Sequence, residues 1–158
     1  MNYLKFKTIL TPAIEILLEQ NKTFKEQTSK ELFTFSNTTD EDLLTFEKKL
    51  GINIPVFYKA FLKEFNPMNF EIMFHGLYGL VEIDRMLSYL NFEFEGQKLL
   101  PIAGDGSGNY FCIEEGNETI FMADHENGFE IIEFTSIEDF FKGLVEEKVS
   151  HTNENNLK

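Results

Sequence analysis

Four short apolar runs with turn signals between them constrain the fold of this chain more than any other feature. The runs cover residues 99–103, 109–114, 119–123 and 129–134, and the turns are Gly104-Asp105-Gly106-Ser107-Gly108, Gly116-Asn117 and Asn127-Gly128. Glycine and asparagine accept the positive φ angles of tight hairpins, and Asn-Gly is the strongest short hairpin signal. The turns are too short for the crossover helices that parallel strands require. The sequence therefore predicts a four-strand antiparallel meander.

A helical hairpin is predicted ahead of the meander, over residues 38–66. Thr38 and Glu41 stand three residues apart, as in a capping box, and Gly51 ends the first helix. Pro55 suits the first turn of the second helix, because an N–H is not needed there.

Other segments complete the predicted order of elements. Thr135 and Glu138 predict a second capping box that opens a closing helix, and the Asn-rich sequence from Val149 is expected to fray. Weaker patterns predict strands at 31–35 and 70–74, a helix from Pro12 and a helix at 81–90. Helices, a meander and a closing helix in this order are typical of the α+β class.

The length of 158 residues leaves room for one domain. We expect a helical extension at 1–37 that packs on the domain, the domain itself at 38–148, and a flexible tail at 149–158. The 18 Phe residues supply enough apolar surface for a core that needs no disulfide or metal for its stability.

The charge of the chain is acidic and unevenly distributed. Lys and Arg number 14 against 27 Asp and Glu, a net charge of -13, and Arg85 is the single arginine. Residues 101–158 hold 13 acidic and 3 basic residues, a net of -10, whereas residues 1–100 hold 14 and 11, a net of -3. Nucleic acids and anionic membranes are bound by clustered cations, so this balance argues against both and favours a basic protein partner. The alternative is an acidic surface that serves solubility alone.

The single cysteine, Cys112, cannot form an internal disulfide, which fits the reducing cytoplasm. Its apolar neighbours predict a buried thiol rather than a nucleophile. Pro12 and Glu15 interrupt the apolar stretch near the N-terminus, so we expect no secretory signal there. We also expect no membrane span, because no apolar run approaches about 18 residues.

The glycine-rich segment 104–108 fits none of the common ligand loops. A dinucleotide fingerprint would need glycine at Asn109, and a calcium loop starting at Asp105 would need glycine at Tyr110 and glutamate at Gly116. The sequence also lacks the Gly-Lys-Ser/Thr of a phosphate loop and, because Asp105 takes the first glycine position, the G-x-S-x-G of a nucleophilic serine. A hairpin turn is the predicted role of this segment.

The histidines give little support for a metal site. His75, His125 and His151 lack the spacing of a zinc-binding helix. Asp124-His125-Glu126 gathers three potential ligands, but neighbours on a strand or turn point in different directions, so an exposed acidic turn is the alternative. We expect no metal and no cofactor, and no nucleophile–base pair stands out from the sequence.

Motifs in all three parts of the chain follow a familiar order. They are Phe46-Glu47, Leu50-Gly51, Ile54-Pro55, Tyr58 and Phe61-Leu62 in the hairpin, Pro101-Ile102-Ala103, Gly108-Asn109 and Phe111 to Ile113 in the meander, and Ser136, Phe140 and Leu144 at the closing helix. With this order and spacing, residues 38–145 resemble the SUKH superfamily, which contains the fungal Smi/Knr-type cell-wall regulators and many bacterial immunity proteins. Two departures affect the partner-facing surface: Asn66-Pro67-Met68 stands where the family commonly has glycines, and residues 1–37 extend beyond the minimal module.

The resemblance implies a curved antiparallel or mixed sheet with helices packed on one side and no catalysis. Bacterial members bind and neutralise toxins delivered between cells, many of them nucleases, and fungal members act as interaction scaffolds. The resemblance thus implies an immunity protein with a protein partner, in agreement with the acidic charge. A regulatory scaffold and a small-ligand or metal-dependent enzyme are the alternatives, and the oligomeric state stays open.

The acidic meander supplies candidate contact residues for a basic toxin domain. Acidic side chains that face a nucleic-acid-binding site would add electrostatic steering and specificity. Chosen from the pattern alone, the candidates are Asp105, Asn109, Glu114, Asp124, Glu126 and Glu130.

Overall fold

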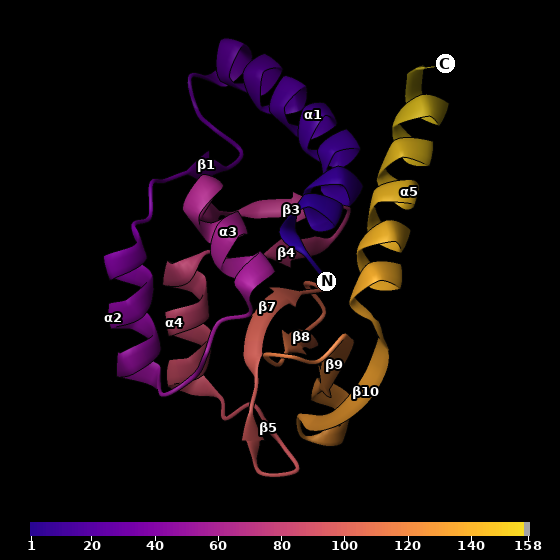
Figure 1. Ribbon diagram of the computed structural model, residues 1–158. Helices are drawn as coiled ribbons and strands as arrows, with labels where there is room; N and C mark the ends of the chain where they lie inside the picture. The colour runs from indigo at the N-terminus through magenta and orange to yellow at the C-terminus, as the bar shows by residue number, and fades with distance from the viewer. Residues whose placement is uncertain (157–158) are drawn as a thin grey trace.

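The structure is a computed structural model that describes residues 1–156, and it has an α+β architecture (Figure 1). The five helices of the described chain are α1 (Tyr3–Thr28), α2 (Asp40–Leu50), α3 (Val56–Glu64), α4 (Leu80–Tyr89) and α5 (Ile137–Asn156). The strands are β1 (Thr34–Phe35), β2 (Pro67–Met68), β3 (Phe70–Ile72), β4 (His75–Leu77), β5 (Glu93–Phe94), β6 (Gln97–Lys98), β7 (Leu100–Gly104), β8 (Tyr110–Ile113), β9 (Thr119–Asp124) and β10 (Glu130–Ser136).

Six of these strands form the main sheet, in the order β10-β9-β8-β7-β4-β3. Every pairing in it is antiparallel, and the β3–β4 hairpin joins the meander where Gly76 pairs with Gly104 and Leu77 with Ala103. Strands β7 to β10 are the four predicted runs, displaced by no more than two residues at either end. The predicted α+β class and meander are therefore confirmed.

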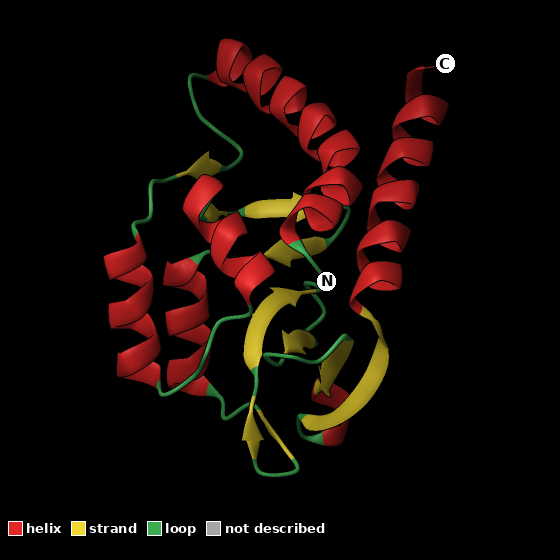
Figure 2. Cartoon of the chain, viewed as in Figure 1, coloured by secondary structure: helices red, strands yellow, loops and turns green. Residues whose placement is uncertain are grey.

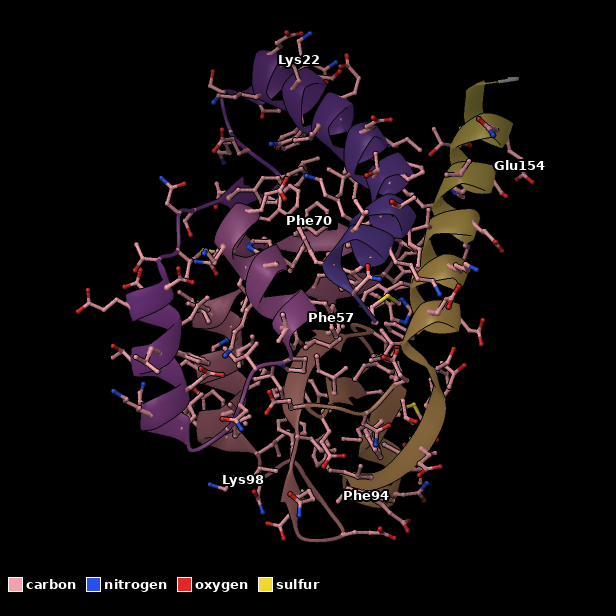
Figure 3. The ribbon with its side chains drawn as sticks, in the orientation of Figure 1. Lys22, Phe57, Phe70, Phe94, Lys98 and Glu154 are labelled. Atoms are coloured by element: carbon pink, nitrogen blue, oxygen red, sulfur yellow. The ribbon has the colours of Figure 1, made fainter. Side chains whose placement is uncertain are left out.

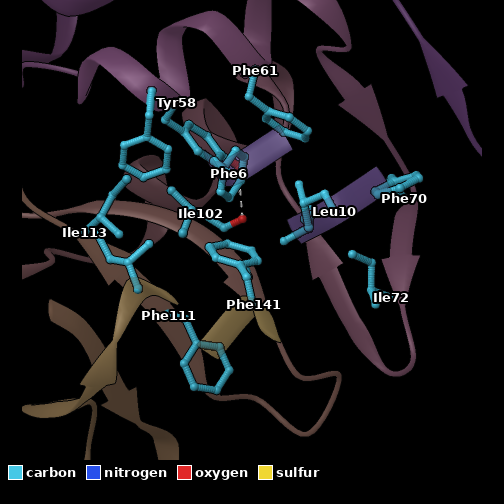
Figure 4. Packing of buried hydrophobic residues seen from close by; sticks show 14 of the residues in the cluster. Phe6, Leu10, Tyr58, Phe61, Phe70, Ile72, Ile102, Phe111, Ile113 and Phe141 are labelled. Atoms are coloured by element: carbon cyan, nitrogen blue, oxygen red, sulfur yellow. Dashed lines mark hydrogen bonds between the residues drawn. The ribbon is translucent and has the colours of Figure 1, made fainter. Parts of the chain in front are cut away.

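Helices α1, α3 and α5 bury the main core against one face of the sheet. Phe6 of α1 lies at its centre, with ring centroids 5.0 Å from Phe57, 5.6 Å from Phe61 and 4.8 Å from Phe141 (Figure 4). Tyr58 is fully buried and donates its hydroxyl to the Tyr78 carbonyl at 2.7 Å, so its polar atom is satisfied. Phe57 of α3 and Phe70 of β3 likewise lie in the interior in Figure 3.

A smaller core lies on the opposite face of the sheet, because successive strand residues point to opposite sides. Its buried members are Phe92, Leu99, Cys112, Phe121 and Ala123. Side chains of α4 and of the β5–β6 hairpin pack over it. Burial raises the pKa of the Cys112 thiol well above its usual value, as expected for a small apolar residue in a core.

Helix α1 begins earlier than the sequence predicts. Asn2 accepts a hydrogen bond from the Lys5 N–H at 2.9 Å and caps the helix, so Pro12 lies in its interior rather than at its start. An interior proline costs a helix about 3 kcal/mol. The burial of Phe6 and Leu10 offsets this cost, a tertiary effect that the local pattern does not contain.

The caps of α2 and α5 both lie one residue beyond the predicted positions. Thr39, not Thr38, caps α2: its hydroxyl accepts from the Asp42 N–H at 3.1 Å, and the Asp42 carboxylate accepts from the Thr39 N–H at 2.8 Å. In each case a second Ser/Thr and acid pair overlaps the predicted one, and the Thr38 side chain is buried instead. At α5, Ser136 and Asp139 form the corresponding pair, with the Asp139 N–H donating to Ser136 Oγ at 3.0 Å.

Two further segments differ from the predictions. The β9–β10 connection is not a two-residue Asn127-Gly128 turn but a short 3-10 turn, His125–Asn127, followed by left-handed φ angles of 69° at Gly128 and 64° at Phe129. The tail predicted at 149–158 is helical as far as Asn156, because Val149 packs against the core and Lys148 donates to Gln20 of α1 at 3.0 Å. Residues 157–158 of that tail lie outside the described residues.

Candidate partner-binding site

Antiparallel pairing places the turns of the meander at alternate ends of the sheet. The β7–β8 loop and the β9–β10 turn therefore share one end, and the β8–β9 turn lies at the other. Residues 105–109 and 124–130 are termed the acidic loop end. It contains five of the six predicted contact residues, namely Asp105, Asn109, Asp124, Glu126 and Glu130, and it leaves Glu114 at the opposite end.

Asp105 folds the first of these loops around its own carboxylate. Its oxygens accept hydrogen bonds from the Ser107 N–H at 2.8 Å, the Asn109 N–H at 3.1 Å and the Asn109 side-chain amide at 2.9 Å. Burial raises the pKa of this carboxyl, but the hydrogen bonds outweigh burial and hold the pKa below its usual value. Asp105 therefore fixes the shape of the loop and has little hydrogen-bonding capacity left for a partner.

Asn109 connects the two loops of the acidic loop end. Its Oδ1 accepts from the His125 N–H at 3.1 Å and lies 2.8 Å from the His125 Nδ1. Gly108 permits this approach, because its φ is +111° and a Cβ there would lie 3.1 Å from Cγ of His125. The two loops consequently form one continuous surface.

Asp124 closes the second loop in the same manner. Its Oδ1 accepts from the Glu126 N–H at 2.9 Å, its Oδ2 accepts from the Asn127 amide at 2.6 Å, and its carbonyl accepts from the Phe129 N–H at 2.7 Å. Asp124, like Asp105, is thus a residue of the turn.

Glu126 and Glu130 differ from these two aspartates. Both are exposed, and within residues 1–156 neither makes an ion pair or a side-chain hydrogen bond. Glu133 on β10 is also exposed. Between Lys98 and Lys142 the sequence contains ten Asp and Glu residues and no Lys or Arg, so nothing in this segment but His125 can offset their charge.

Glu114 is separated from the other predicted contacts. It lies in the β8–β9 turn, half-buried, and accepts from the Asn117 side-chain amide at 3.2 Å. The candidates were chosen from the charge pattern alone, although the predicted meander already implies that the turn with Glu114 lies at the end opposite the other two turns.

The sequence reasoning missed the exposed apolar residues beside these acids. Phe74 in the β3–β4 turn is 74% exposed, and Ile132 and Phe134 on β10 are 42% and 50% exposed. An open hollow of about 540 Å³ lies between the β3–β4 turn and the β7–β8 loop, lined by Glu71, Phe74, His75, Asp105, Gly106 and Ser107. Phe74 was predicted to end a strand, but Met73 takes a φ of +56° and turns the chain after Ile72.

The residue types that commonly act in catalysis or metal binding are used for packing here. His75 lies among aromatic rings, with ring centroids 5.4 Å from Phe111 and 5.8 Å from Phe140. Burial lowers the pKa of His75, although Asp105 and Glu147 oppose this shift, and its Nδ1 has no hydrogen-bond partner in the described chain. Nowhere in residues 1–156 do three His, Cys, Asp or Glu side chains come together as a potential metal-ligand group. The loop end is suited to recognition by charge and apolar contact.

The chain has a counterpart among known protein families. A sequence model of the SMI1/KNR4 family (SUKH-1) matches residues 37–143, which is more than half of the chain. The chain belongs to this family, whose members are generally non-catalytic immunity or regulatory proteins, and the predicted resemblance is confirmed. A search of curated proteins gave no match. No helix of the described residues is long and apolar enough to cross a membrane.

Proposed function

We propose that this protein is an immunity protein that acts in the cytoplasm by binding and neutralising the basic domain of a toxin, without catalysis. The observation that carries the proposal is the surplus of unpaired acidic side chains on the meander of a fold whose family includes immunity proteins. The binding surface is the acidic loop end.

The proposal assigns different roles to the predicted contact residues. Glu126 and Glu130 face solvent and contact the partner. Asp105, Asn109 and Asp124 hold the two loops together and present those glutamates.

Charge complementarity explains how such a surface neutralises a toxin. A nuclease must hold phosphates with Lys and Arg, so its active site is basic. An acidic protein surface is attracted to that site over several ångströms, associates quickly, and excludes the nucleic acid once bound. A stable complex of this kind buries about 1,200–2,000 Å².

Partner capture followed by a matched pair of variants tests the proposal. Tagged protein on beads is exposed to lysate of its own source at low and at high salt, and we expect one basic toxin domain, shed more readily at high salt. Calorimetry then compares Glu126→Lys/Glu130→Lys with the control Glu115→Lys/Glu146→Lys, which makes the same charge change at exposed sites elsewhere. Reversal at the loop end should weaken binding about 100-fold, and the control should stay within about twofold of wild type.

Other outcomes point to other functions. Equal affinity of the two double variants would refute the acidic loop end as the binding surface. Several unrelated partners would favour a regulatory scaffold of the Smi/Knr type. Retention of no protein would contradict the proposal and return attention to the hollow beside Ser107 as a site for a small ligand.

A further inference from the structure

Strand β10 is the outermost strand of the main sheet, and among the described residues β9 is the one strand that pairs with it (Figure 2). It spans seven residues, whereas β3 at the other edge spans three. Within residues 1–156, the backbone of 130–134 forms hydrogen bonds with no segment other than β9. An edge strand presents a row of unused N–H and C=O groups, and this row can pair with another chain.

The side chains of β10 make this edge partly apolar and partly acidic. Ile132 and Phe134 are exposed on the face that α5 continues, and the Phe134 ring centroid lies 5.6 Å from that of Phe111, so one side of the ring rests on the core. Glu130 and Glu133 are exposed along the same strand. Phe134 stands at a bulge between Glu133 and Thr135, which ends the regular part of the edge.

We propose that β10 binds its partner by strand addition: an extended segment of the partner, carrying Lys or Arg alternately with apolar residues, pairs with the outer edge of Glu130–Phe134. This inference rests on the proposed function and adds the mode of binding. Backbone hydrogen bonds supply the pairing, and side chains on alternate positions supply the selection. Apolar partner residues cover Ile132 and Phe134 on one face of the sheet, while cations on the other face lie beside Glu133. Glu130 lies on the apolar face at the end of the strand and adds to the negative charge of this edge.

The negative charge of β10 favours a basic partner strand over a second copy of the chain. Pairing of two β10 strands would bring Glu130 and Glu133 of both copies together, and like charges on neighbouring strands are destabilising. The segment from Lys98 to Lys142 offers no Lys or Arg to offset them. Acidic residues on an edge commonly prevent self-association, and the same residues admit a basic strand.

Peptides test strand addition directly. The probe is capped Lys-Val-Lys-Ile-Lys-Val-Lys, and the control has the same charge but proline in place of its three apolar residues, which prevents pairing along the backbone. Amide exchange of the full chain is followed by NMR. With the probe, we expect outward-facing amides within 130–134 to exchange about tenfold more slowly. The proline peptide should leave these amides unchanged.

Variants of the chain add a second readout. Glu130→Lys/Glu133→Lys should weaken binding of the probe about tenfold or more, and Glu115→Lys/Glu146→Lys should bind as wild type does. Equal effects of the two peptides, or of the two double variants, would overturn the proposal. Protection of β10 that grows with protein concentration and needs no peptide would replace it by self-pairing.

The outcome separates this inference from the proposed function. A captured toxin domain that leaves the amides of 130–134 unprotected would refute strand addition while the immunity role stands. Protection by the probe in a protein that captures no toxin would support the edge site and contradict the immunity role.

Discussion

Acidic residues on the helices and acidic residues on the meander have different surroundings. On the helical side, carboxylates meet lysines: Glu47 with Lys59 at 2.8 Å, Glu64 with Lys7 at 2.6 Å, Asp84 with Lys49 at 2.7 Å and Asp40 with Lys63 at 2.9 Å. Residues 99–136 contain eight Asp and Glu, and among the described residues one of them forms an ion pair, Glu118 with the N-terminal amine of Met1.

The ion-paired carboxylates on the helical side have partners within the fold, whereas the unpaired carboxylates of the meander are available to a partner protein. Exposed ion pairs add little stability, but they cancel charge locally. The unpaired acids of the meander instead sum to a negative potential, which raises the rate of encounter with a basic protein. The ends of α1 and α5, where Lys22 and Glu154 lie, project away from the meander (Figure 3).

Removal of the packing that holds the helices on the sheet should destabilise the protein more than any other change considered. Phe6→Ala should lower the free energy of unfolding by about 3–5 kcal/mol, because the ring is fully buried among the aromatic rings of α3 and α5. Urea denaturation followed by circular dichroism measures the loss. Leu4→Ala, 76% exposed on the same helix, is the control and should change stability little. A loss below about 1 kcal/mol for Phe6→Ala would contradict the packing of α1.

Neutralisation of the meander acids should weaken partner binding without any loss of stability. Glu126→Gln/Glu130→Gln should weaken partner binding about tenfold and leave the free protein equally or more stable, since it removes like-charge repulsion without breaking an ion pair. Calorimetry and urea denaturation give the two numbers. Loss of stability in this variant would show that these carboxylates have structural partners.

The pH dependence of the free energy of unfolding tests whether His75, which lies between the helical face and the loop end, is buried. Burial lowers the pKa of His75, so below about pH 6.5 the unfolded chain binds a proton at this residue more readily than the folded chain does. The free energy of unfolding therefore decreases as the pH is lowered through this range. His75→Leu should reduce the loss of unfolding free energy between about pH 7.5 and pH 5.5. Phe74→Leu, at an exposed and non-titrating residue next to His75, is the control and should retain the wild-type dependence. An unchanged profile for His75→Leu would assign the effect to other groups.

Glu138, a paired acid near the start of α5, should affect stability less than the groups above. Hydrogen bonds from Lys142 and Lys5 lower the pKa of Glu138 to about 2. Its folded pKa is below its unfolded value, so its contribution to stability is present above about pH 4.5 and is lost as the pH falls toward 2. Glu138→Gln should slightly reduce the acid sensitivity of unfolding, measured by urea denaturation at about pH 7 and pH 3. Greater acid sensitivity in this variant would contradict the sign of the shift.

Local signals were sufficient for most elements of the fold. The period of two in the meander and the glycines between its runs predict four strands and their order, because hairpin turns need positive φ angles and leave no room for crossovers. The capping residues were misplaced by one position at Thr39 and Ser136, since overlapping Ser/Thr and acid pairs satisfy the same local rule. The early start of α1 was missed although Asn2 is a favoured capping residue, because Pro12 suggested a helix start of its own and the Phe6 packing that supports the longer helix joins distant parts of the chain.

The order of residues along the chain is enough to specify the meander, its turns and the surplus of acid between Lys98 and Lys142. These depend on neighbours in the chain and on composition. The tertiary structure was needed to show that Asn109 joins the two loops through His125, that the β3–β4 hairpin pairs with β7, and that, within residues 1–156, β10 pairs with β9 alone. Strand pairing and hydrogen bonds between loops set these properties, and both join residues whose proximity a linear pattern does not encode.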